Sequence, residues 1–159
     1  MFRFVAMSVA AAAMIAITAP PVIAGPAETA FLQKLSNTWQ GRGQLSGAES
    51  GPISCRLVFA SGGRNVKYQG RCAIPDMAAQ AFSGSLSYND QTGRYEARSA
   101  GGVVPGERRG DRLIFTTSSR NVRGTATSTM TISPSSLVVD FAMVDRDGGK
   151  TTSRITFDR

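Results

Sequence analysis

The sequence predicts an all-β protein: one antiparallel up-and-down barrel of about 8–10 strands that follows a short N-terminal helix. Three observations predict this class. Apolar and polar residues alternate with a period of two in about nine short segments. Turn-forming Gly, Asn, Asp and Pro residues separate these segments. The connections are short enough for neighbouring strands to pair in chain order, which favours a barrel over a sandwich.

Residues 1–24 are typical of a signal peptide. Arg3 gives a positive start, an apolar stretch covers residues 4–18, and residues 22–24 fit a small-residue cleavage site. The alternative is a retained N-terminal anchor. Two prolines, however, interrupt the apolar run before it reaches the ~20 residues that a spanning helix needs. We therefore expect an exported protein of the periplasm or the cell exterior that is not integral to a membrane.

The elements of the exported chain follow in order. Residues 25–38 predict a short helix and linker in which Ala30, Phe31 and Leu35 share one apolar face. Residues 39–159 predict a single barrel domain, and its segments of period two lie at residues 39–45, 53–59, 68–74, 81–88, 94–99, 112–117, 122–132, 137–143 and 155–157.

The two cysteines lie in a predicted hairpin, residues 53–74. A turn centred on residues 63 and 64 places Phe59 opposite Tyr68 and Cys55 opposite Cys72. Opposed Cβ atoms of antiparallel strands lie ~4.5–5.5 Å apart, close to what a disulfide needs. We therefore predict a structural Cys55–Cys72 disulfide worth roughly 3 kcal/mol. The alternative is a redox-active pair, but such pairs usually have Cys-x-x-Cys spacing beside a helix.

Small residues recur on the predicted inner face, and they have two interpretations. Glycine in strands marks places where a barrel wall bends, whereas small side chains also leave room for a ligand. The residues that we expect to border a lumen are Trp39, Gly84, Ala126 and Phe141.

Charge gives a second candidate site. The chain has a net charge of +7. Arg42, Arg56, Lys67 and Arg71 fall on the predicted outer face, with Arg56 opposite Arg71. A basic wall of this kind attracts anionic material, although a merely solvated surface is the simpler interpretation. Nucleic acid is not an expected partner, because the strands lack exposed aromatic residues among the basic ones.

Residues needed for common catalytic chemistry are missing. The chain has no histidine, which removes Ser-His and Cys-His nucleophiles and typical catalytic zinc sites. Both thiols are expected to be bonded, and no serine lies three positions before a lysine. We therefore expect no catalytic residues, no metal, no cofactor and no enzyme activity.

A family resemblance adds to the fold prediction. The motif W-x-G-x-G at Trp39–Gly43, after a short helix, resembles the first strand of calycin-type barrels, the lipocalin, avidin and nitrobindin-like group. Together with Cys55-Arg56, Arg71-Cys72-Ala73 and Phe82-x-Gly84-x-Leu86, it also resembles small exported alphaproteobacterial proteins. The resemblance implies a barrel and an exported location. It transfers no site residues, and haem binding through histidine is excluded here.

Two functions follow from these observations. One is a periplasmic barrel that binds a small apolar ligand in its lumen. The other is an envelope interaction protein whose basic outer surface binds anionic envelope components.

Overall fold

The computed structural model describes residues 25–74, 79–122 and 124–159. These residues form one helix and ten strands: α1 (Gly25–Gln33), β1 (Asn37–Gly47), β2 (Gly51–Gly62), β3 (Asn65–Ala73), β4 (Gln80–Asn89), β5 (Arg94–Ser99), β6 (Gly102–Arg109), β7 (Arg112–Asn121), β8 (Gly124–Ile132), β9 (Leu137–Asp145) and β10 (Lys150–Asp158). The predicted signal peptide lies outside the described residues.

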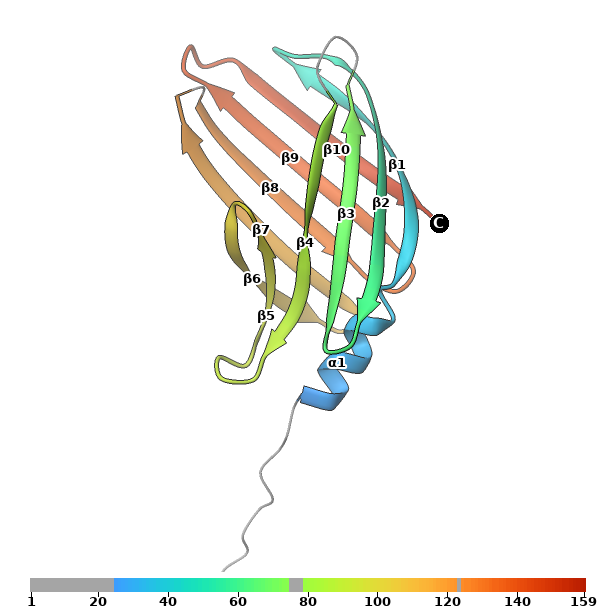
Figure 1. The fold of residues 1–159 in the computed structure, drawn as a ribbon. Coiled ribbons are helices and arrows are strands. Elements are labelled where there is room, and N and C mark those ends of the chain that lie inside the picture. The colour runs from blue at the N-terminus through green and yellow to red at the C-terminus, as the bar shows by residue number, and fades with distance from the viewer. Residues whose placement is uncertain (1–24, 75–78, 123) are drawn as a thin grey trace, which may run out of the picture.

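The strands close into a barrel in chain order (Figure 1). Each strand pairs antiparallel with the next, and β10 returns to pair with β1, where Gln40 lies opposite Asp158. The short connections make this order the favoured one. The predicted all-β up-and-down barrel with one short helix is therefore confirmed.

The β2–β3 hairpin has the predicted register. Cys55 lies opposite Cys72, Arg56 opposite Arg71 and Phe59 opposite Tyr68. The two cysteines form a disulfide with a Cα–Cα distance of 4.1 Å. The period-two pattern alone was enough to align this hairpin, because a shift by one residue would turn every apolar side chain outward.

Two details of the prediction were wrong: the place of Ala30 on the buried face and the omission of the strand at residues 102–109. Helix α1 ends at Gln33, because the next backbone N–H groups bond three residues back: Leu35 N–H, for example, donates to the carbonyl of Leu32 at 3.0 Å. This tighter turn buries Leu32 and Leu35 and leaves Ala30 exposed, not on the buried face. Strand β6 was not predicted, because its Gly102, Pro105 and Gly106 obscure the alternation.

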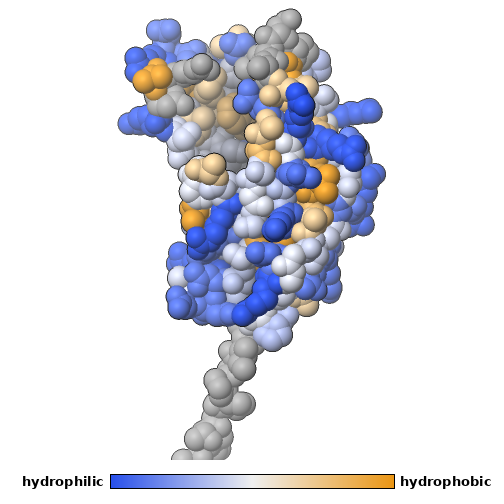
Figure 2. Space-filling model, in the orientation of Figure 1, coloured by the Kyte–Doolittle hydropathy of each residue, from blue (hydrophilic) through white to orange (hydrophobic). Residues whose placement is uncertain are grey.

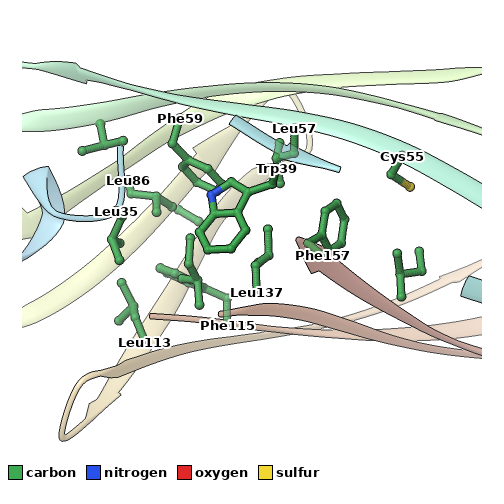
Figure 3. Close-up of a cluster of buried hydrophobic side chains, with 14 of the residues drawn as sticks. Leu35, Trp39, Cys55, Leu57, Phe59, Leu86, Leu113, Phe115, Leu137 and Phe157 are labelled. Carbon is green, nitrogen blue, oxygen red and sulfur yellow. The ribbon is translucent and has the colours of Figure 1, made fainter. Parts of the chain in front are cut away.

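The barrel is solid at the end that α1 covers. Helix α1 closes this end (Figure 1). Leu32 and Leu35 are fully buried there, together with Val66, Leu86 and Leu113 from the surrounding strands. Trp39 occupies the middle of this core, and Phe157 lies between it and Cys55 (Figure 3).

Aromatic rings cover four of the inward glycines of the wall. Each ring belongs to the directly opposed residue on the neighbouring strand, and the pairs are Gly41–Phe157, Gly70–Phe82, Gly84–Tyr68 and Gly106–Phe115. A ring that packs over a cross-strand glycine fills the missing side-chain volume and lets the sheet bend. These glycines therefore serve curvature, and the space above them is already occupied.

Candidate ligand site in the open half of the barrel

The half of the barrel that lies away from α1 is only partly filled: Leu45, Ile53 and Ile155 are buried there, whereas inward residues of β4 and β7 are accessible. Inward positions near α1 are buried, but beyond Phe115 on β7 the inward Thr117 and Ser119 are exposed. On the opposite wall, Phe82 of β4 is 40% exposed, although its cross-strand partner on β3 is Gly70, which has no side chain to cover it. Apolar and hydroxyl side chains at inward positions thus remain accessible at this end.

The barrel wall is shorter where β5 and β6 form a short hairpin. Pairing between β4 and β5 stops at Gly84 and Ser99, so residues 80–83 extend beyond β5. Pairing between β6 and β7 stops at Gly106 and Phe115, so residues 102–105 of β6 and residues 116–121 of β7 are not paired with each other. The space-filling view is hollowed above the tip of this hairpin (Figure 2). The interior is therefore open from the side as well as from the end.

The lining of this open half is apolar and hydroxylated. Phe141 and Met143 of β9 and Ala126 and Ser128 of β8 are half-buried and share the inward face. Met130 and Val139 pack against the core below them and form the floor. Among the described inward positions of this open half, the single charged group is Asp145 at the rim, whose carboxylate accepts bonds from the N–H groups of its own turn. Such a lining fits a ligand without net charge.

The residues predicted to border a lumen fall into two groups. Trp39 is 1% exposed and lies in the packed core, with the guanidinium of Arg159 5.3 Å from its ring centre. Gly84 faces inward beneath the ring of Tyr68. Ala126 and Phe141 lie in the open half. The fold thus brings Ala126 and Phe141 together and separates both from Trp39.

The residues of the predicted anionic surface all lie on the outside of the barrel. Arg42, Arg56, Lys67 and Arg71 are exposed on β1, β2 and β3, and Arg56 and Arg71 are cross-strand partners. They do not contribute to the open half, so the two candidate sites are separate.

Sequence reasoning missed one polar cluster at the closed end. Arg108 of β6 has inward parity, and its Nη1 donates to Glu28 Oε2 at 2.8 Å and to the hydroxyl of Tyr95 at 3.2 Å. Its guanidinium also lies 4.0 Å from the ring centre of Phe31. These contacts fasten α1 to the barrel. If β6 had been predicted from the sequence, its parity would have placed Arg108 on the inner face, next to α1.

The described residues contain no group of three or more side chains suited to hold a metal ion. No helix among them has the length and apolarity to cross a membrane. A disulfide is typical of proteins that fold in an oxidising compartment, and the Cys55–Cys72 bond fits that environment.

Comparison with known proteins supports the fold. Neither a protein-family model nor a curated protein matches the sequence. The structure is similar to that of the S-type phycobiliprotein lyase CPES from Guillardia theta, with a TM-score of 0.58 and 12% identity over 82% of this chain and 90% of that chain. The resemblance to calycin-type barrels is supported at the level of fold, whereas the narrower resemblance to alphaproteobacterial proteins is not supported.

One prediction is corrected by this comparison. The missing histidine and the bonded thiols led us to expect a protein without enzyme activity. That expectation is contradicted, because the solved barrel of similar fold is a lyase. The lack of a few familiar catalytic side chains is therefore no ground to exclude enzyme activity.

Proposed function

We propose that this protein is an exported, periplasmic barrel that binds a small, largely apolar ligand in its open half. The observation that carries the proposal is the accessible inward face beyond the core, where Phe82, Thr117 and Ser119 are exposed beside the half-buried Phe141 and Met143. Export is supported by the disulfide and by the leader-like sequence of residues 1–24.

The chemistry of the ligand follows from the lining. Apolar side chains on both walls favour hydrocarbon or aromatic surface, and burial of such surface provides ~25 cal/mol per Å². The hydroxyls of Ser119, Ser128 and Thr117 provide a few hydrogen bonds for orientation. Among the described residues that line this half, Asp145 at the rim is the single one that carries a charge to pair with a charged ligand. The preferred ligand is therefore neutral.

An apolar reporter dye tests the proposal. N-phenyl-1-naphthylamine, which fluoresces when it leaves water, should bind the purified protein saturably, with one dye per chain. Ala126→Phe fills the open half and should weaken binding by about tenfold or more, because burial of the added ring displaces a ligand of similar size. Thr127→Phe adds the same ring to the outer face of the same strand and should leave binding unchanged.

The outcomes are distinct. Absence of saturable binding, or equal affinity in the two variants, would overturn the proposal. Gly84 is not a useful position for this test, because a side chain there meets the backbone of Arg98 and the ring of Tyr68 and would disturb packing instead.

A further inference from the structure

The wall formed by β1–β4 carries positive charge that forms no ion pair with an acidic side chain in the part of the chain that the structure describes. Its charged residues are Arg42, Arg56, Lys67 and Arg71, and no Asp or Glu occurs in these four strands. The five ion pairs recorded among the described residues all lie on other elements: Arg64–Asp90, Arg98–Glu96, Arg108–Glu28, Arg109–Glu107 and Arg154–Asp140. The charge of this wall is therefore available to a partner.

The centre of the wall is an unfavourable pair of like charges. Arg56 and Arg71 are directly opposed on β2 and β3, and both side chains point outward and are exposed. Asp158 is separated from Arg56 by Gln40 of β1, which pairs with both residues. Like charges that face each other across strands destabilise a sheet. A bound anion removes that repulsion, and two guanidiniums offer several donors to one phosphate.

Two grooves lie on the same wall as the Arg56–Arg71 pair. A groove of about 430 Å³ is lined by Arg56 and Arg71 together with Val58, Ala81 and Phe82. A second groove of about 530 Å³ on the same wall is lined by Lys67 and by small or polar side chains such as Ala60 and Ser85. Because few bulky side chains stand between the cations, an extended charged surface can approach all of them. Figure 2 shows hydrophilic residues of this face separated by small and apolar ones.

We propose that the β1–β4 wall docks onto a bilayer surface that contains anionic phospholipids. Phosphate groups lie between Arg56 and Arg71, and Arg42 and Lys67 contact neighbouring headgroups. The apolar floor of Val58 and Ala81 faces the interfacial region. This inference goes beyond the proposed ligand binding, because it depends on the outer wall and not on the open half.

Vesicle co-sedimentation of the purified protein tests the inference. The protein should bind vesicles of phosphatidylcholine that contain phosphatidylglycerol at about one lipid in four, and added salt should weaken the binding because it screens exposed charges. Arg56→Glu combined with Arg71→Glu should reduce binding by about tenfold or more. The control combines Arg112→Glu with Arg146→Glu, two exposed arginines on other elements, and should lose no more than about threefold from the same change in net charge.

A second variant guards against misfolding. Arg56→Gln combined with Arg71→Gln removes the repulsion and should fold at least as well as the natural protein while it also loses vesicle binding. Equal loss in the control, equal binding to phosphatidylcholine alone, or no binding by the natural protein would overturn the inference. Because dye binding in the open half should be unchanged in all of these variants, failure of this proposal and failure of the proposed function are distinguishable.

Discussion

The ring of Phe157 lies over Gly41, its cross-strand partner on β1, where a side chain at residue 41 would otherwise stand. A Cβ at Gly41 would fall 2.5 Å from Cε1 of the ring. The ring is 5% exposed and packs in the same core as Trp39. This pair belongs to the core on the β10–β1–β2 side of the barrel, which continues past it to the buried Ile53 and Ile155.

Substitution of Gly41 should therefore destabilise the protein by overpacking. Gly41→Val is expected to cost about 1–3 kcal/mol in the free energy of unfolding, because it forces the ring from its place. Urea denaturation measures this cost. The control is Gln40→Val, an exposed outward position on the same strand, which should change stability by less than about 0.5 kcal/mol. Equal effects at both positions would contradict the packing that we describe.

The disulfide should contribute stability without forming the fold. Replacement of both Cys55 and Cys72 by serine should lower the free energy of unfolding by roughly 3 kcal/mol, since the bond closes a loop between residues 17 apart in the chain. Urea denaturation with and without a reductant measures this effect. The natural protein should lose stability on reduction, while the double variant should not respond. A variant as stable as the oxidised protein would show that the bond is not structural.

Arg108 should hold helix α1 against the barrel. Arg108→Ala removes its bonds to Glu28 and Tyr95 and its contact with Phe31, and should cost about 1–2 kcal/mol. Hydrogen exchange of the α1 amides should also become faster. Arg109→Ala is the matched control, because its exposed pair with Glu107 should contribute at most about 1 kcal/mol. If the control loosened α1 to the same extent, the contacts of Arg108 would not be what fastens the helix.

Glu96 should titrate below its ordinary range. The bond from Asn89 Nδ2 at 2.8 Å lowers the pKa of Glu96 most, and Arg98 lowers it further, while desolvation opposes both. Since the folded state holds the lower pKa, the stabilisation is present above the pKa of the unfolded chain and is lost as the pH falls through the folded pKa. Asn89→Ala should raise the pKa of Glu96 in an NMR titration. A pKa that stays unchanged would mean that the Asn89 bond does not form in solution.

Much of the fold could be predicted from period-two alternation, and the reasons are local. The β2–β3 register followed from matching the apolar residues and both thiols across one turn. Strand β6 could not be found this way, because Pro105 and its neighbouring glycines carry little alternation. Ala30 was misplaced, because the buried face of the helix is formed by Phe31, Leu32 and Leu35, and Ala30 lies about 200° around the helix from Leu32.

The candidate site was less predictable, since it depends on which small residues another strand covers. Gly84 and Ala126 look alike in the sequence as inward small residues. In the fold, Tyr68 fills the space over Gly84, whereas the surroundings of Ala126 stay open because the β5–β6 hairpin is short. Cross-strand coverage of this kind follows from register over the whole barrel and not from any single segment.

Native mass spectrometry of the natural protein, expressed with its full sequence and purified without denaturation, tests the central claim most directly. The account predicts a chain that begins at Gly25, lighter by two hydrogen atoms than its reduced form, with additional bound mass that disappears on unfolding. That mass should be absent from Ala126→Phe and present in Thr127→Phe. A natural protein without bound mass, or bound mass undiminished by Ala126→Phe, would contradict a ligand in the open half of the barrel.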